Sequence, residues 1–248
     1  MNTMRPLHII MPMAGEGSRF VREGWTTPKP LIEVGGVPLF LRALSSVAGA
    51  EPVKHSFIIR QEHAERFGLE RTIKSVLPDA GIFAVRQTTR GAVESCLLAE
   101  SALDSEDAVL VMDCDLEFRS ADFAAHIEQI LALPAADAPA GGVLVSFDSD
   151  SPRYSYAAAD PVTGNVIRVA EKEVISRHAL CGAYFFASSD IFLNAAHRLA
   201  GNGTTAAELY VSLLYNLLLA DGLTVSLTCA DEYRSYGTPE ELTRYAKQ

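Results

Sequence analysis

The sequence predicts an α/β fold in which a Rossmann-like, mostly parallel sheet is flanked by helices and followed by a smaller mixed-sheet region. In the first half of the chain, short β-rich runs alternate with amphipathic helical patterns, as parallel strands joined by crossovers require. Beyond residues 134–142, which concentrate Pro, Gly and Ala, the pattern changes to strands that look antiparallel. The chain has 248 residues, of which 48% are apolar, and this is enough to bury a substantial core.

The expected strands of the first half are apolar along their whole length, so they should be buried on both faces of the sheet. We place them at residues 6–13, 53–60, 81–87 and 107–115. Helices with apolar residues at three- and four-residue spacing are expected at 38–50, 64–77, 90–103 and 120–133. The order of these elements predicts a run of βα units.

The second half predicts a smaller set of strands followed by helices. The expected strands are 142–148, 155–160, 165–171 and 180–187, and the segment 160–165 between two of them is typical of a hairpin turn. Helices at 188–200 and 206–220, a strand at 223–229 and a final helix from Pro239 complete the chain. We expect residues 1–248 to form a single domain with two parts, 1–133 and 134–248.

Charge and composition exclude several classes of protein. The formal net charge is -10, and no block of Lys and Arg provides the footprint that nucleic-acid binding needs. No apolar run approaches the ~20 residues that cross a bilayer, and the N-terminal apolar stretch is too short for an export signal. The four cysteines are widely spaced, which argues against a zinc site or a disulfide scaffold. We therefore expect a soluble cytoplasmic protein with no nucleic-acid or membrane partner.

A glycine-rich loop follows the first strand directly. Residues 14–20 read AGEGSRF, which places Gly15, Gly17 and Arg19 where the chain must turn. Such a loop can wrap an anion with successive N–H groups, although the two glycines alone also suit an ordinary turn. It matches neither the dinucleotide-binding fingerprint nor the Walker pattern. Lys29 stands between two prolines downstream, so we expect a stiff, extended segment to present it beside the loop.

The segments MAGEGSRF and PKPLIEVGGVPL match, in order and spacing, the N-terminal signature of the sugar-phosphate nucleotidyltransferase family. The chain resembles this family over nearly its whole length. The resemblance implies that an NTP and a phosphorylated acceptor, commonly a sugar 1-phosphate, give an NDP-linked product and pyrophosphate. It also implies that Ala14, Gly15 and Gly17 hold the triphosphate, that Arg19 braces the leaving pyrophosphate, and that Lys29 contacts the phosphates around the scissile bond.

The expected fourth strand ends in Asp113-Cys114-Asp115, and strand alternation would put both carboxylates on one face. Mg²⁺ prefers oxygen ligands, often one or two carboxylates together with substrate phosphates. By the resemblance, Asp115 is the metal ligand and Mg²⁺ the cofactor. Asp113 is either a second ligand or an acid that caps the loop.

Members of the family usually carry a second metal-binding acid two positions before the glycine of a Gly-Thr-Pro-Glu motif. Ser235 stands at that position here. Ser235 could hold a metal-bound water, or Asp231, Glu232 or Glu208 could replace the missing acid, and the sequence does not select among them.

Other contacts are implied by position within the family. Gln87, at the end of the expected third strand, and Gly91, in the turn that follows, correspond to nucleotide contacts. In the second half, which the resemblance makes the acceptor-binding part, Glu171 would accept hydrogen bonds from hydroxyl groups and Lys172 would face the acceptor's phosphate. Adjacent residues of a strand point to opposite sides unless a local irregularity turns both inward. Glu208 is a further acceptor-site candidate.

Residues 151–160 and 173–186 most resemble a branch of the family found in capsule and surface-glycoconjugate pathways. A sugar 1-phosphate is the expected acceptor, and a cytidylyltransferase for a non-sugar phosphate or phosphonate is an alternative. A glycosyltransferase that uses 113–115 to bind a metal and a diphosphate is a second alternative, and a non-catalytic nucleotide-binding regulator is a third. The sequence specifies neither the nucleotide base, nor the acceptor, nor the oligomeric state.

Overall fold

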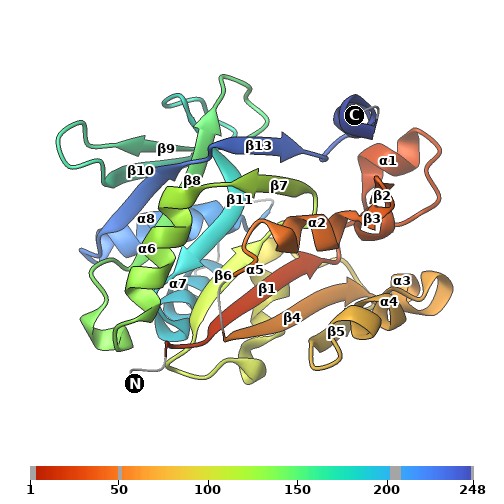
Figure 1. Ribbon diagram of the computed structural model, residues 1–248, viewed down its shortest axis with the longest axis horizontal. Helices are drawn as coiled ribbons and strands as arrows, with labels where there is room; N and C mark the ends of the chain where they lie inside the picture. Colours follow the sequence, from red (N-terminus) through yellow and green to blue (C-terminus); the bar gives the residue numbers. More distant parts are fainter. Residues whose placement is uncertain (1–3, 50–51, 202–207, 247–248) are drawn as a thin grey trace.

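The computed structural model describes residues 4–49, 52–201 and 208–246, and its centre is a nine-stranded mixed sheet (Figure 1). The main path of the sheet runs β10 (Val166–Glu171), β9 (Ser155–Ala159), β11 (His178–Phe186), β6 (Ala108–Met112), β1 (Leu7–Met13), β4 (Val53–Arg60) and β5 (Gly81–Val85). Two further strands extend the sheet from β11, namely β8 (Gly142–Asp148) and β12 (Val225–Cys229). The predicted fold class is confirmed.

The first half of the chain forms the parallel part of the sheet, as predicted. β1 lies between β4 and β6 and pairs in parallel with both, and β4 pairs in parallel with β5. β6 ends at Met112, so residues 113–115 lie in the loop beyond it and not in the strand. The expectation that 81–87 is buried on both faces is wrong, because β5 is the edge strand and is only partly covered.

The second half contributes the antiparallel strands and one parallel pair, β8 with β12. β11 pairs antiparallel with β6 on one side and with β8 on the other, which joins the two parts of the chain in one sheet. β9 and β10 form the predicted hairpin. Its turn is closed by Asp160, whose carboxylate accepts hydrogen bonds from the backbone N–H groups of Val162 and Thr163. The expectation of a mixed region is therefore confirmed.

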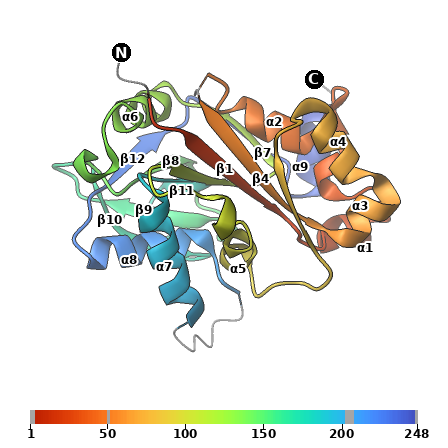
Figure 2. The ribbon, with the colours of Figure 1, turned by 90° about the horizontal axis from the view of Figure 1, so that it is seen from below.

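Helices cover both faces of the sheet (Figure 2). One face carries α2 (Leu39–Ser45), α3 (Gln61–Phe67), α4 (Leu69–Val76) and α6 (Ala121–Leu131). The other carries α5 (Ala92–Leu97), α7 (Ser189–Gly201) and α8 (Leu214–Ala220). None of the helices among the described residues is both long and apolar enough to span a membrane.

Several predicted helices differ from the structure. The expected helices 38–50 and 90–103 are shortened to α2 and α5. The expected helix 64–77 is divided, because Gly68 adopts a left-handed conformation with φ +66° between α3 and α4. Residues 206 and 207 of the expected helix 206–220 lie outside the described residues. Where that segment is described, a 3-10 turn, Val211–Leu213, leads into α8.

A third, smaller core joins the two ends of the chain beside the sheet. Its buried side chains come from α1 (Ser18–Arg22), the short strand β2 (Glu33–Val34), α2 and α9 (Pro239–Ala246), and from the segments next to them. The antiparallel pair β7 (Leu116–Arg119) and β13 (Glu232–Ser235), which the sequence did not predict, leads the chain into α9. Tyr236 then donates its backbone N–H to the carbonyl oxygen of Asp115 at 2.7 Å. The C-terminal segment is thereby fixed beside the loop that follows β6.

Arg5 is a buried cation that stabilises the opposite end of the sheet. Its side chain is 8% exposed and donates hydrogen bonds to the carbonyl oxygens of Glu106, Ile130, Leu133 and Ala187. Replacing Arg5 with methionine would leave these acceptors without their donor, at a cost of about 2–4 kcal/mol in the free energy of unfolding. Urea denaturation followed by circular dichroism measures the loss. Arg71→Met, at an exposed position of α4, is the control and should change stability by less than about 0.5 kcal/mol.

His8 should make stability depend on pH. Its ring is 2% exposed, with Nε2 2.8 Å from Oγ of Ser56 and Nδ1 3.4 Å from Oδ2 of Asp107. Burial lowers the pKa of His8 in spite of the nearby Asp107 carboxylate. The unfolded chain therefore binds a proton near pH 6.5 that the folded protein does not, so His8 contributes stability above this pH and loses it as pH falls.

We expect the free energy of unfolding to decrease from pH 7.5 to pH 5.5 by at most about 1.4 kcal/mol per pH unit from this group. Urea titrations at the two pH values should show a smaller decrease for His8→Asn than for the parent. His63, whose pKa burial also lowers, is present in both proteins and cancels in the comparison. Equal decreases in both proteins would show that His8 does not contribute.

Candidate active site

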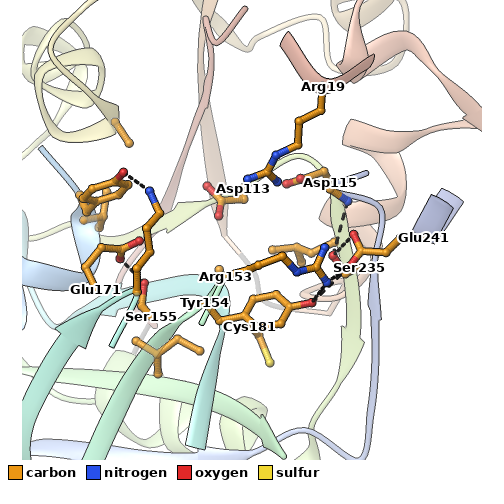
Figure 3. A pocket seen from close by; sticks show the side chains of 18 of the residues that line it. Arg19, Asp113, Asp115, Arg153, Tyr154, Ser155, Glu171, Cys181, Ser235 and Glu241 are labelled. Atoms are coloured by element: carbon orange, nitrogen blue, oxygen red, sulfur yellow. Dashed lines mark hydrogen bonds and ion pairs between the residues drawn. The ribbon is translucent and has the colours of Figure 1, made fainter. Parts of the chain in front are cut away.

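A cavity of about 510 Å³ lies beyond the carboxyl ends of β1 and β6 (Figure 3). This is where an open α/β sheet binds its ligands. The loop after β1, the loop after β6, the β9–β11 strands and the segment between β13 and α9 all contribute to its walls. Residues far apart in the sequence therefore face one space.

The glycine loop forms one wall. Gly17 has φ +61° and turns the chain into α1, which only glycine does without strain. Within the described part of the chain, the backbone N–H groups of Gly15, Glu16 and Gly17 have no hydrogen-bond acceptor. Gly17 and Arg19 border the cavity, whereas Gly15 does not, and Ala14 is packed into the core at the end of β1. The loop thus offers free N–H groups and a cation at the same place.

Lys29 lies beside this loop, with its Cβ 3.8 Å from the point that a Cβ on Gly17 would occupy, and it pairs with Asp115. The expected extended presentation is only partly right, because Pro28 is extended while Lys29 itself begins a 3-10 turn, Lys29–Leu31. The Lys29 side chain is 24% exposed and that of Asp115 20%. Burial alone would lower the pKa of Lys29, but the negative charge of Asp115 more than offsets this and raises it. Lys29 is therefore a fixed cation.

Asp113 and Asp115 both border the cavity, as predicted, although they do so from a loop and not from one face of a strand. The carboxylate of Asp113 has no hydrogen-bonding or ionic partner among the described residues. Burial, reinforced by the charge of Asp115, raises the pKa of Asp113 to about 7. Gly182, with φ +89°, allows the Asp113 carboxylate to pack closely against the backbone of β11. A Cβ at position 182 would lie 2.7 Å from Oδ2 of Asp113.

Two of the acids considered as replacements for the missing second carboxylate lie elsewhere. Asp231 accepts a hydrogen bond from the backbone N–H of Ala121 at 3.0 Å, at the start of α6. Glu232 pairs with Arg119 at 3.3 Å on the surface. Neither residue borders the cavity in this structure, so neither is placed to act as the second acid here.

Glu241, which the sequence analysis did not single out, does border the cavity. Its carboxylate accepts hydrogen bonds from the Ser235 hydroxyl at 2.9 Å and from Arg153 at 2.7 Å. Burial favours the neutral acid, but these donors outweigh it and lower the pKa of Glu241. Glu241 is therefore ionised and is held by Ser235, the serine that stands where members of the family usually carry an acid.

Glu171 and Lys172 line the opposite end of the cavity together. β10 ends at Glu171, and Lys172 has φ +55°, the only positive φ of a non-glycine residue in the described segments. This irregularity turns both side chains toward the cavity. Without it, adjacent residues of a strand would point to opposite sides. The Glu171 carboxylate accepts hydrogen bonds from the hydroxyls of Ser155 and Ser212, the latter at 2.9 Å.

Lys172 also interacts with two polar side chains, Tyr210 and Glu208. Its ammonium donates to the Tyr210 hydroxyl and lies 4.5 Å from the centre of that ring, and Tyr210 donates in turn to Glu208. The hydrogen bond to Tyr210 is the main reason that the pKa of Lys172 is raised. Glu208 therefore borders the cavity beside Tyr210 and is engaged there, away from the position of the missing acid near Asp115, and its acceptor-site role stays a prediction.

Gln87 and Gly91 are not part of the cavity wall. Gln87 is exposed beyond the end of β5, and its neighbour Thr88 contacts Glu16 of the glycine loop at 3.2 Å. Gly91 has φ +141°, and a Cβ there would lie 2.5 Å from the backbone nitrogen of Leu209. The close packing of two backbones explains this glycine, and the nucleotide contacts of Gln87 and Gly91 stay predictions.

The sequence analysis also missed Arg153, Tyr154, Ser155 and Tyr210 as cavity residues. The only signal for the first three was the segment 151–160, in which basic and aromatic residues precede a strand, and Tyr210 lies outside it. In the part of the chain that the structure describes, no three His, Cys, Asp or Glu side chains are grouped closely enough to hold a metal ion by themselves. Any metal held there would complete its coordination with water or with oxygen atoms of the substrate.

Comparison with known proteins is consistent with this arrangement. Among curated proteins, the bifunctional protein GlmU of Novosphingobium aromaticivorans is 28% identical over 235 residues, which cover 92% of this chain and 48% of GlmU. The chain thus spans about half the length of the curated relatives it matches.

Two solved structures share the fold. The nucleoside-diphosphate-sugar pyrophosphorylase from Vibrio cholerae RC9 has a TM-score of 0.78 at 26% identity, and the match covers 97% of this chain and 100% of that one. The inositol-1-phosphate CTP transferase from T. maritima has a TM-score of 0.74 at 12% identity, covering 100% and 98%. The nucleotidyl transferase family model matches residues 8–242, from β1 to α9. Because this match includes every wall of the cavity, the chain belongs to the nucleotidyl transferase family and is a nucleotidyltransferase.

Proposed function

We propose that this enzyme transfers a nucleotidyl group from an NTP to a sugar 1-phosphate and releases pyrophosphate, in the synthesis of precursors for surface polysaccharides. One observation carries the proposal. The cations Arg19 and Lys29, the carboxylates after β6 and the pair Glu171–Lys172 all border one cavity. The relative from Vibrio cholerae, whose description names a nucleoside-diphosphate-sugar pyrophosphorylase, supports the substrate class.

The reaction needs positioning and charge neutralisation more than covalent work by the protein. The free N–H groups of the glycine loop and Arg19 would hold the triphosphate, and Lys29 would neutralise the α-phosphate. Lys172 would hold the acceptor's phosphate, and Glu171 would accept hydrogen bonds from its hydroxyl groups. An oxygen of the acceptor's phosphate then attacks the α-phosphorus in line, the bond to the bridging oxygen breaks, and pyrophosphate leaves with that electron pair.

The donor set also fits Mg²⁺. Asp115 forms an ion pair with the Lys29 ammonium, and the Asp113 carboxylate has no partner among the described residues. Both are oxygen ligands of the kind Mg²⁺ prefers, with the remaining positions left to phosphates and water. A bound Mg²⁺ would neutralise phosphate charge at the reacting centre.

Pyrophosphate release tests the function directly. CTP, UTP, GTP, dTTP and ATP are each combined with a library of sugar phosphates and phosphorylated alcohols, amines and phosphonates. We expect one NTP and one sugar 1-phosphate to give pyrophosphate and an NDP-sugar in equal amounts. Turnover only with a non-sugar phosphate or phosphonate would replace the acceptor class. NTP binding without pyrophosphate would indicate a regulator, and consumption of an NDP-sugar would indicate a glycosyltransferase.

A further inference from the structure

We propose that Glu241, at the start of α9, supplies the second carboxylate of the magnesium site and that Ser235 positions it. The inference rests on the proposed function, because it concerns the same site. It also gives a reason for the absence of an acid at position 235. The carboxylate would reach the site from six residues further along the chain, and the serine hydroxyl would hold it.

The position of Gly237 shows that the two carboxylates share one space. A Cβ placed on Gly237 would lie 3.1 Å from Oδ2 of Asp115 and 3.4 Å from Oε2 of Glu241. The same point lies 3.5 Å from Oγ of Ser235. Oxygen atoms of Asp115, Ser235 and Glu241 therefore all lie within 3.5 Å of one point beside Gly237.

Glu241 has a fixed position and a fixed charge. Its backbone N–H donates to Oγ1 of Thr238 at 3.2 Å in the first turn of α9, and its side chain is held by Ser235. The residue is 8% exposed, yet its donors keep its pKa below the ordinary value. The next residue, Leu242, anchors α9 in the third core. An ionised carboxylate in a rigid setting is what a metal ligand requires.

Both carboxylates already attract cations from the protein. Lys29 pairs with Asp115, and Arg153 pairs with Glu241 at 2.7 Å (Figure 3). These side chains lie where positive charge is stabilised, so a divalent cation between the two carboxylates fits the electrostatics of the site. Lys29 and Arg153 would then be released toward the phosphates of the substrates.

The competing explanation is that Glu241 serves only to anchor Arg153. The two roles differ in what removing Arg153 does. If Glu241 is a ligand, Arg153→Gln removes a competing cation, so affinity for a divalent metal should stay equal or increase. If Glu241 only anchors Arg153, any effect of the glutamate on metal affinity passes through the arginine, and Arg153→Gln should weaken binding as much as Glu241→Gln does.

Mn²⁺ binding to the full chain, followed by the electron paramagnetic resonance signal of free Mn²⁺, tests the inference without turnover. We expect Glu241→Gln to weaken Mn²⁺ binding about tenfold or more, as loss of a carboxylate ligand should. Glu240→Gln, the exposed neighbour on the same helix, is the matched control and should bind like the parent. The double variant Ser235→Asp/Glu241→Gln should recover affinity to within about threefold of the parent, which a merely structural role of Glu241 does not predict. Circular dichroism checks that each variant is folded.

Asp115→Asn separates this inference from the proposed function. If Asp115→Asn lost Mn²⁺ binding and Glu241→Gln did not, Glu241 would not be a ligand. The proposed nucleotidyl transfer reaction would not be affected by that result. Equal weakening by Arg153→Gln and Glu241→Gln would also overturn it. So would an absence of Mn²⁺ binding by the parent protein. Pyrophosphate release, measured separately, decides the activity.

Discussion

Replacing Lys29 with methionine is expected to lower kcat for pyrophosphate release by about 10³-fold, since preorganised charge at a reacting centre is worth this much. The ammonium pairs with Asp115 in the cavity wall, and its pKa is raised above the ordinary value for lysine, so it is positively charged at neutral pH. Methionine keeps the volume of the side chain and removes the charge. Single-turnover assays at saturating NTP separate this loss from weaker binding.

Lys54→Met is the matched control for this substitution. Lys54 forms the corresponding lysine–aspartate pair with Asp107, at 2.9 Å, at the opposite end of the sheet. Its loss should reduce stability while leaving kcat within about threefold of the parent. If Lys29→Met lowered kcat no more than Lys54→Met does, the ammonium would have no part in the chemistry.

The parallel half of the sheet could be predicted because its strands are continuous apolar runs and its helices have the matching period. The pair β7 and β13 could not. Each has only four residues. LEFR alternates apolar and polar residues over too few positions to identify a strand, EYRS shows no such alternation, and Leu116 pairs with Ser235 across more than a hundred positions. Their pairing depends on the tertiary structure, which brings the end of the chain back to the loop after β6. That return creates the wall of the site that sequence reasoning missed.

Some residues of the candidate site could likewise be predicted from the sequence, and others could not. The positions of Arg19 and Asp115 could be predicted because both residues follow strands, and that of Lys29 because it stands between two prolines in a short, distinctive motif. Glu241 could not, since a glutamate in the first turn of a helix is common for electrostatic reasons that have nothing to do with a site. The shared inward direction of Glu171 and Lys172 depends on one backbone angle, φ +55° at Lys172, and no residue pattern encodes it.

Arg19→Ala is expected to slow turnover by about 10²–10³-fold. This is the usual effect of losing one preorganised donor that stabilises charge developing in the transition state. Arg19 reaches over Asp113 and Asp115 from the glycine loop (Figure 3), and among the described residues it pairs with no carboxylate. A cation without an internal partner is free to hold the leaving pyrophosphate, and its planar fork of donors can bind two phosphate oxygens at once.

Three comparisons make the Arg19 prediction specific. Arg19→Lys keeps the charge without the fork, so its rate should lie between those of Arg19→Ala and the parent. Arg22, on the same short helix, does not border the main cavity, and Arg22→Ala should stay within about threefold of the parent. Pyrophosphate should also bind more weakly to Arg19→Ala by calorimetry, because the arginine is assigned to that product. Turnover of Arg19→Ala within threefold of the parent, with unchanged pyrophosphate affinity, would remove Arg19 from the mechanism and leave the N–H groups of the glycine loop as the grip on the leaving group.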